Sequence, residues 1–566
     1  MAQSKVRWVV LFVILFLLLL MVVTSLRDTV GSDAVLVVDL GGEISEQKLT
    51  GPGAVFGAQP TLMYQVLDVI DAARDDSRIL GIAVRVTGND AGWGKLTEIR
   101  ERLIEFRKSG KPSICFMYSD LTDNRQYYLA TGCDQVWLVP TGSLGVTGMM
   151  AQGTFVRGTL DKLGIYPDMY GIAEYKNYRD MFTQKKFTPA HREAAEALMR
   201  AFYGKFLADV AEARQMDRAE FEKLVNAGPF LDADALKAKL VDKLAYWDEV
   251  QQFFRDKSSG GEWNPVDVKQ YAKTLGAVGG DAIAVVHATG TIVVGQSGFD
   301  PITGGAIMGS ESVSADLRRA RDDDSVKAIV LRVDSGGGSA VASEIIRREV
   351  VRAREKKPVV VSMSDVAASG GYWISMSASK ILAGATTVTG SIGVVYGKMN
   401  ISGLYNLLGL STDHVATSEN ATFLWPQQNF TPAQREMLMK QMRGIYDSFI
   451  AGVADGRKMK VEDVDKIGKG RVWAGGTALE LGLVDEAGGY TRAVEIAKEL
   501  ADIPAEQKVR IERYPKEKTF FETLMELTGS EARQANPAAA LREHLRRASE
   551  GRDFIEARIP FDLKIR

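Results

Sequence analysis

The chain contains the same α/β pattern twice, with the second copy about 248 residues after the first. The segment Asp33–Asp39 reads DAVLVVD and returns as DAIAVVH at Asp281–His287, and the GSLGV of Gly142–Val146 returns as GSIGV at Gly390–Val394. A period this long exceeds that of solenoid and propeller repeats, so it predicts a duplicated domain. A chain of 566 residues has room for two domains of about 200 residues and some extensions.

Short runs rich in Val and Ile alternate with amphipathic stretches in each copy, which predicts buried parallel strands with crossover helices, an α/β layer architecture. In the second copy the expected order is strand 282–287, helix 312–322, strand 328–333, helix 341–356, strand 359–363, a helix from 369 and strand 380–383. Each copy continues into a long helical region, for which Thr188 and Thr431 fit the N-cap position.

Changes in composition suggest where the domains end. Ser258–Gly261 is rich in Ser and Gly and indicates a linker between the copies. The charged residues beyond about Ala505 have no evident counterpart in the first copy, so we expect a peripheral arm toward a neighbouring subunit or the membrane surface. The predicted parts are a cytoplasmic N-terminus and anchor (1–28), the first copy (29–255), a linker (256–280), the second copy (281–504) and a tail (505–566).

An apolar run of 19 residues at Trp8–Leu26 is just long enough to cross a bilayer. Lys5 and Arg7 precede it, whereas Arg27 is followed at once by Asp28. This charge bias predicts a cytoplasmic N-terminus, a single pass through a bacterial inner membrane, and periplasmic domains. A cleaved signal peptide is the alternative, but no small-x-small cleavage pattern follows the run, which favours an uncleaved anchor.

The charge balance and the two cysteines say little about the function of the chain. The 70 Lys and Arg nearly balance the 72 Asp and Glu, which gives no reason to propose nucleic acid as a partner. Both cysteines, Cys115 and Cys133, lie in the first copy, and Cys115 sits in an apolar strand pattern, so we expect a buried free thiol. A disulfide between them is the alternative, which their spacing does not support.

The two copies differ in chemistry where the strand at 359–363 runs into its helix. The second copy has Ser369-Gly370-Gly371, whereas the first has Asn124-Arg125-Gln126. A serine at a strand-to-helix turn between small residues suits nucleophilic attack, since the helix N-terminus favours developing negative charge. The competing interpretation is an N-cap serine in a tight turn.

A glycine cluster adds weight to the catalytic interpretation. The second copy reads DSGGGS at Asp334–Ser339, which lets backbone amides point at a ligand, as an oxyanion hole requires. Bulkier residues occupy the matching turn of the first copy, Thr87–Gly92. Only the second copy is therefore equipped to hold a tetrahedral oxyanion.

A nucleophilic serine needs a base, and the histidines are poor candidates. None of the four lies in a glycine-rich segment or beside an obvious carboxylate partner, which argues against a Ser-His-Asp triad; they are His191, His287, His414 and His544. Lysine is the remaining option if burial lowers its pKa far enough. Lys176 has no lysine counterpart near Ala416–Asn420, but its charge alone would place it on a solvated surface.

The sequence resembles the signal peptide peptidase A family, also called protease IV, in its long duplicated bacterial form. The resemblance spans roughly residues 30 to 505 and rests on four segments: Asp365–Trp373, Arg332–Ser339, Gly390–Gly393 and Glu174–Asn177. It implies tandem crotonase-like domains related to the caseinolytic protease, with helical extensions. It also implies a Ser/Lys dyad whose members come from opposite copies.

Carried over by position, the resemblance makes Ser369 the nucleophile and Lys176 the general base. The Gly370 amide, with that of Gly337 or Gly338, would form the oxyanion hole. The hydroxyl of Ser391 would orient the lysine amine. The family usually has proline where this chain has Gly336, which loosens the loop but removes no donor.

The leading hypothesis is a membrane-anchored serine endopeptidase that cleaves apolar peptides, such as released signal peptides, through an acyl-enzyme. The resemblance implies a homotetramer, and we expect neither a metal ion nor a cofactor. A crotonase-type acyl-CoA enzyme is one alternative, against which the anchor argues. A non-catalytic membrane scaffold is another, against which the complementary Ser369 and Lys176 argue.

Overall fold

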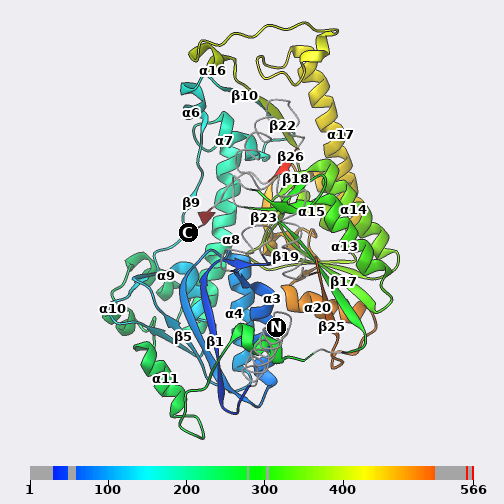
Figure 1. Cartoon of the computed structure of the whole chain (residues 1–566). Coiled ribbons are helices and arrows are strands. Elements are labelled where there is room, and N and C mark those ends of the chain that lie inside the picture. The colour runs from blue at the N-terminus through cyan, green and yellow to red at the C-terminus, as the bar shows by residue number, and fades with distance from the viewer. Residues whose placement is uncertain are drawn as a thin grey trace, which may run out of the picture.

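The computed structural model describes residues 30–48, 59–276, 279–300, 305–516, 556–558 and 564–565. Two α/β units with parallel sheets lie side by side, which confirms the predicted duplication and α/β architecture (Figure 1). The predicted anchor at 1–28 lies outside the described residues. Among the helices that are described, none is long and apolar enough to cross a membrane.

The first unit has a six-stranded sheet in the order β11-β7-β5-β4-β1-β12. Its strands are β1 (Ala34–Gly42), β4 (Ile79–Asn89), β5 (Ser113–Met117), β7 (Gln135–Leu138), β11 (Lys243–Leu244) and β12 (Pro265–Asp267). Its helices include α3 (Met63–Asp75), α4 (Trp93–Arg107), α5 (Asn124–Ala130), α8 (Pro189–Ala213), α9 (Arg218–Ala227), α10 (Asp232–Lys237), α11 (Trp247–Arg255) and α12 (Val268–Thr274). Apolar residues on one sheet face pack against Val250 and Phe254 of α11, and those on the other face join the main core.

The second unit repeats this plan, with a central strand order β23-β21-β19-β17-β13-β25. Its strands are β13 (Ala282–Thr289), β17 (Val326–Ser335), β19 (Val359–Ala368), β20 (Lys380–Ala383), β21 (Val388–Gly390), β23 (Val472–Ala474), β24 (Glu486–Ala487) and β25 (Arg510–Tyr514). Its helices are α13 (Ser310–Asp322), α14 (Ala340–Arg354), α15 (Gly370–Ser375), α16 (Ser402–Leu407), α17 (Pro432–Arg457), α18 (Val461–Ile467), α19 (Gly475–Glu480) and α20 (Tyr490–Leu500). The predicted strands and helices fall within or close to these bounds.

A third sheet joins the two units, in the order β10-β22-β26-β18-β14-β16-β15. Its strands are β10 (Tyr166–Gly171), β14 (Thr291–Val293), β15 (Gly298–Phe299), β16 (Ala306–Gly309), β18 (Gly337–Ser339), β22 (Val395–Asn400) and β26 (Glu556–Arg558). Strand β10 of the first unit pairs antiparallel with β22 of the second along its whole length. The main apolar core is also shared, because Ile283, Val285 and Val330 of the second unit belong to the same buried cluster as the first unit.

The residues expected to be a linker and a peripheral tail contribute to the sheets instead. Strand β12, within 256–280, pairs parallel with β1, and β25, beyond 505, pairs parallel with β13. Each copy therefore completes one edge of its own sheet with a late strand, β12 after α11 and β25 after α20. The expectation that the tail has no counterpart in the first copy is wrong for β25, since its place in the second sheet matches that of β12 in the first. The sequence did not reveal this strand because its five residues mix charged and apolar types and resemble surface sequence.

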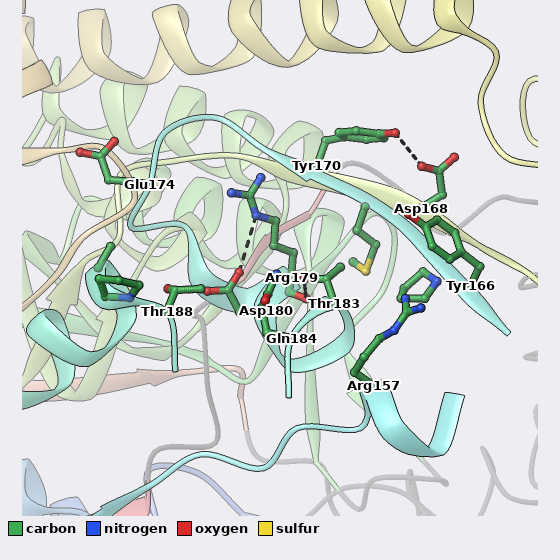
Figure 2. Close-up of a pocket in the computed structure, with 14 residues that line it drawn as sticks. Arg157, Tyr166, Asp168, Tyr170, Glu174, Arg179, Asp180, Thr183, Gln184 and Thr188 are labelled. Carbon is green, nitrogen blue, oxygen red and sulfur yellow. Dashed lines mark hydrogen bonds and ion pairs between the residues drawn. The ribbon is translucent and has the colours of Figure 1, made fainter. Parts of the chain in front are cut away.

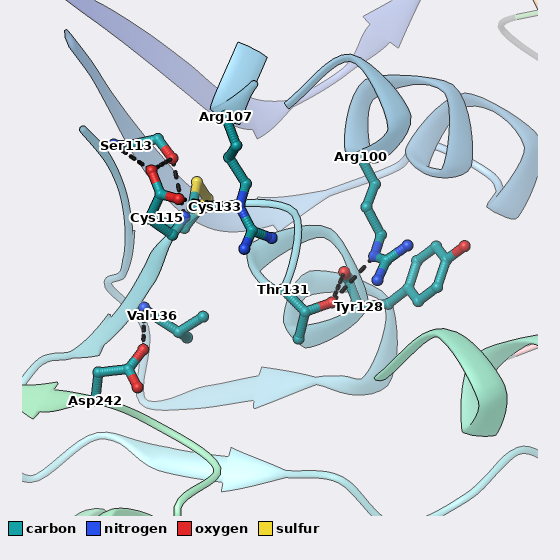
Figure 3. Close-up of a disulfide and its surroundings, with 10 residues drawn as sticks. Arg100, Arg107, Ser113, Cys115, Tyr128, Thr131, Cys133, Val136 and Asp242 are labelled. Atoms are coloured by element: carbon teal, nitrogen blue, oxygen red, sulfur yellow. Dashed lines mark hydrogen bonds and ion pairs between the residues drawn. A yellow bond between two sulfur atoms is a disulfide. The ribbon is translucent and has the colours of Figure 1, made fainter. Parts of the chain in front are cut away.

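The cysteines form a disulfide between Cys115 of β5 and Cys133, in the turn after α5 (Figure 3). The expectation of a free thiol is therefore wrong. The spacing of 18 residues gave no hint of it, because the pairing depends on α5 folding back against β5 to bring the two Cα atoms to 5.6 Å, within the usual range for a disulfide.

Candidate active site

Ser369 lies at the turn from β19 to α15 and is fully buried. Its backbone has φ 57°, a left-handed conformation that is uncommon for residues other than glycine and often occurs at functional sites. Its side chain makes no helix-capping hydrogen bond. Ser369 thus occupies the N-cap position of α15, as the competing interpretation expected, but its hydroxyl does not cap the helix and is left for another partner.

Lys176 is brought to this turn by the segment that follows β10. Beyond the β10–β22 pairing, Ile172 N–H donates to Val394 O at 3.0 Å and Tyr175 N–H donates to Lys469 O at 3.1 Å. Gly470 has φ 79°, and a Cβ atom there would lie 2.5 Å from the backbone nitrogen of Lys176. Glycine at this position lets the first copy's lysine segment lie directly on the second copy.

The Lys176 Nζ lies 2.7 Å from Ser369 Oγ, within one chain. It also lies 3.0 Å from Ser391 Oγ and 3.1 Å from Ser391 O, so this one residue holds the amine with two oxygens. Lys176 and both serines are fully buried. Burial lowers the lysine pKa well below its usual value, because the charged form loses its hydration.

The glycine loop lies against the Ser369 turn. Gly337 and Gly338 have φ 102° and 156°, whereas Gly336 is not among the residues with a positive φ. A Cβ on Gly370 would lie 3.1 Å from Gly337 Cα and 3.2 Å from Gly338 N, so the segments touch closely. The Gly337 N–H already donates to Ser335 Oγ at 3.1 Å. The Gly337 amide therefore already has a partner, and the Gly338 nitrogen lies close to Gly370.

The matching turn of the first copy is closed by its own side chains. Asn124 takes the place of Ser369, donates from Nδ2 to Gly148 O at 2.8 Å, and accepts from the Thr147 N–H at 3.2 Å. The amide therefore ties two turns together and offers no nucleophile.

Among the described residues, no histidine is a hydrogen-bond partner of Ser369 Oγ or Lys176 Nζ. His287 is buried against Tyr64, and burial lowers its pKa to about 4. His191 lies between Phe155 and Phe187, and His414 is on an exposed segment against Trp425. His544 lies outside the described residues.

A pocket of about 590 Å³ opens beside the lysine segment (Figure 2). It is lined by first-copy residues, including Arg157, Asp168 and Tyr170. Glu174 and Arg179, from the residues around Lys176, contribute to its wall. Neither Lys176 nor Ser369 lines it, so its position does not identify the site of the dyad.

Sequence reasoning missed three charged residues next to the site: Lys95, Asp334 and Asp365. The two aspartates begin or precede the segments singled out above, but Lys95 lies in the first turn of α4 and has no local sequence signal. Its Nζ lies 2.6 Å from Asp334 Oδ2 and 2.9 Å from Asp365 Oδ2. The first copy thus reaches the second at two points close to Ser369.

Comparison with known proteins agrees with this arrangement of two units. The model of peptidase family S49 matches residues 105–259 and 352–504, one segment in each copy. The chain is 34% identical over 523 residues to "Protease 4" of Salmonella typhi, a match that covers 88% of this chain and 82% of that protein. It is 31% identical over 506 residues to "Serine protease SPPA, chloroplastic" of Arabidopsis thaliana, covering 88% and 73% respectively. Because the family model matches a segment in each copy and the matches span more than two thirds of these relatives, the chain belongs to peptidase family S49.

Proposed function

We propose that this S49 serine peptidase is an endopeptidase that works with a Ser/Lys dyad, Ser369 as nucleophile and Lys176 as general base. The observation that carries the proposal is the 2.7 Å approach of the buried Lys176 Nζ to Ser369 Oγ. The distance is within the range in which a base can take a proton directly. Both groups are buried, which lowers the pKa of Lys176 and so favours the neutral amine that a general base needs.

The two oxygens of Ser391 give the lysine a defined role. A neutral amine has two N–H groups and one lone pair. With the N–H groups donating to Ser391 Oγ and Ser391 O, the lone pair faces the Ser369 hydroxyl. Ser391 thereby orients the base. Its φ of 51° is a left-handed conformation of the kind that often occurs at functional sites, which supports this role.

The reaction then follows from these groups. Ser369 Oγ attacks the peptide carbonyl carbon while its proton moves to Lys176, and the negative charge on the carbonyl oxygen is stabilised by the amides of Gly370 and Gly338. The C–N bond breaks, and Lys176 returns the proton to the leaving amine. Water then attacks the acyl-enzyme with Lys176 again accepting a proton, which releases the acid product and restores Ser369.

The substrate binds as an added strand. Strand β26, a short piece of this chain's own C-terminal region, lies between β18 and β22, antiparallel to β18, with Gly338 opposite Ala557 (Figure 1). An extended backbone can therefore pair with the edge of the glycine loop. Main-chain pairing of this kind accepts many sequences, as an endopeptidase for apolar peptides such as released signal peptides needs.

The place of action is the outer side of a bacterial inner membrane, to which the apolar run at 8–26 anchors the chain. The disulfide between Cys115 and Cys133 supports this location, because disulfides persist in oxidising compartments and are rare in the cytosol. A periplasmic site near the membrane surface would meet signal peptides after their release from precursors.

The chain assembles as a homotetramer through a contact that repeats the one within it. Helix α16 follows the plan of α6 (Arg157–Lys162), so residues 411–416 are the counterpart of β10. Whereas β10 pairs with β22, residues 411–416 form no strand, and Leu408, Leu410 and Val415 nearby are exposed. Docking of this segment on the first copy of a second chain would continue the same head-to-tail contact, and four such contacts close into a ring when each turns the next chain by a quarter turn.

The test compares Ser369→Ala with Ser448→Ala, a serine on the exposed side of α17. The full chain, purified in detergent, is given an apolar signal peptide, and cleavage is followed by mass spectrometry. We expect Ser369→Ala to lose at least about 1000-fold in kcat and Ser448→Ala to match the wild type. Undiminished cleavage by Ser369→Ala would contradict the dyad, and so would a wild-type chain that binds coenzyme A but cleaves no peptide.

A further inference from the structure

Two aspartates at the carboxyl ends of neighbouring strands share one lysine from the other copy. Asp334 stands near the end of β17 and Asp365 near the end of β19, both in the second copy. Lys95 Nζ lies 2.6 Å from an Asp334 oxygen and 2.9 Å from an Asp365 oxygen. All three side chains are largely buried, with relative exposures of 9% for the lysine and 15% for each aspartate.

Asp365 also closes the amino end of α4, the helix that carries Lys95. The N-cap residue of α4 is Gly92, which has no side chain to cap it. Asp365 accepts from the Gly92 N–H at 3.1 Å and from the Lys95 N–H at 2.9 Å, and so supplies the cap from the other copy. A Cβ on Gly92 would lie 2.4 Å from Asp365 Cγ, so glycine is needed for this approach.

Both aspartates are covalently close to the catalytic segments. Asp365 lies on β19, which ends at Ala368, the residue directly before Ser369. Asp334 precedes Ser335, whose Oγ accepts from the Gly337 N–H and donates to Gly290 O. Asp334 also accepts from the Val366 N–H at 3.2 Å and so links the two strands directly. A shift of either carboxylate would therefore move the nucleophile or the glycine loop.

A second ionic cluster lies deeper in the interface. The guanidinium of Arg332, fully buried, lies 2.8 Å from Glu46 and 2.8 Å from Glu98 of the first copy. It also donates to Ser362 and Ser364 of its own copy. Arg332 precedes Asp334 by two residues, and with Lys95 it fixes the ends of β17 and β19 on the first copy. Without Lys95, the carboxylates of Asp334 and Asp365 would be buried without their only cationic hydrogen-bond partner among the described residues.

We propose that Lys95 is a positioning residue that holds the oxyanion loop and the nucleophile strand in register by bridging Asp334 and Asp365. This role rests on the proposed Ser369 and Lys176 chemistry. The first copy then supplies two lysines with different roles. Lys176 is the neutral base that contacts Ser369, and Lys95 is a charged residue that holds the two aspartates and does not contact Ser369. In this proposal the first copy contributes to the site in two ways: it supplies Lys176, and through Lys95 it positions the two aspartates of the second copy.

The test measures kcat and KM of Lys95→Met in the full chain on an apolar peptide, with Lys95→Arg as the conservative variant. A misplacement near 1 Å at reacting atoms costs about 100-fold in rate, so we expect Lys95→Met to lower kcat at least tenfold, roughly, while KM stays within about threefold. Lys95→Arg should recover part of kcat, since it restores the charge. The matched control is Arg513→Met, which breaks a different ion pair between the copies, with Asp68, and should leave kcat unchanged.

Asp365→Asn and Asp334→Asn provide the second route if Lys95→Met does not fold, and each should lower kcat with little change in KM. A kcat within twofold of wild type, roughly, in folded Lys95→Met or in both aspartate variants would overturn the proposal. Equal losses in Lys95→Met and Arg513→Met would also overturn it, since they would indicate general loosening of the interface. A Ser369→Ala variant that keeps activity would refute the dyad itself, which separates that failure from failure of the role proposed for Lys95.

Discussion

The Lys176 amine lies 2.7 Å from the Ser369 hydroxyl although the two residues are 193 positions apart and belong to different copies of one duplicated domain. Strand β10 carries the lysine segment across to the second copy by pairing with β22. Asn124 fills the position equivalent to Ser369 in the first copy and is tied to its neighbours by hydrogen bonds. One chain thus brings the serine of one copy and the lysine of the other into hydrogen-bond contact.

The pH dependence of kcat/KM should report the titration of Lys176. Burial lowers the pKa of this lysine, and only its neutral form can accept the Ser369 proton. Activity should therefore rise as pH increases through the lowered pKa and be near its maximum well below the pH at which an exposed lysine titrates. Lys176→Met and Lys176→Arg should lose activity at every pH, whereas Lys466→Met, at an exposed lysine, should keep the wild-type profile. A rising limb unchanged in Lys176→Arg would assign the titration to another group.

Gly470→Ala should separate the lysine from the serine. A Cβ at this position would lie 2.5 to 2.6 Å from the backbone and Cβ of Lys176, so the lysine segment must move. We expect kcat to fall by about 100-fold in a folded protein. Gly482→Ala is the matched control, because Gly482 has a similar φ of 74° but nothing within 4 Å of an added Cβ. It should lose about 1 kcal/mol of stability and little activity. Equal kcat in the two variants would show that the Lys176 contact is unimportant.

Truncation after Lys516 should favour cleavage of added peptides. It removes β26, which pairs with β18 where the substrate strand is proposed to bind. We expect KM to fall and kcat/KM to rise, because the peptide no longer competes with the chain's own strand. Truncation after Arg558 is the control, since it keeps β26 but removes β27 (Lys564–Ile565). If both truncations behave alike, β26 does not compete with substrate.

Removal of the disulfide should lower stability without altering the chemistry. The bond closes a loop between positions 18 residues apart, so the double variant Cys115→Ala and Cys133→Ala should lose about 3 kcal/mol in unfolding free energy. Urea unfolding monitored by fluorescence gives this value, and kcat below the transition should match wild type. A reducing agent should destabilise the wild type to the same extent and leave the double variant unchanged. A wild-type protein indifferent to reduction would argue against the bond.

Charges on the exposed apolar segment of the second copy should break the proposed tetramer. Leu408 and Val415 are 65% and 103% exposed, respectively, so Leu408→Asp with Val415→Asp has no reason to unfold the chain. Light scattering after size-exclusion chromatography should show a smaller species than wild type. The control is Leu231→Asp, at a leucine that is 65% exposed in the first copy and should leave the assembly intact. Because the dyad lies within one chain, the smaller species should still react at Ser369.

Local patterns in the sequence determined the elements of this fold. Apolar runs and helical periodicity depend on neighbouring residues, and they predicted the strands around Val330 and Val360 close to their observed bounds. They failed at β25, whose mixed residues pair only because β13 offers an edge. Local patterns also failed to predict the disulfide of Cys133, because the residues around this turn carry no sign of its partner Cys115 on β5.

The sequence by itself determined that the chain is duplicated, that Ser369 stands at a strand-to-helix turn among glycines, and, through family resemblance, that Lys176 is its partner. Only the tertiary structure decided that Lys176 meets Ser369 within one chain, that the Gly337 amide donates to Ser335, and that Lys95 bridges Asp334 and Asp365. The physical reason is that a strand or a turn is encoded by nearby residues, whereas the contact of a buried charge with its partner depends on how two whole domains pack.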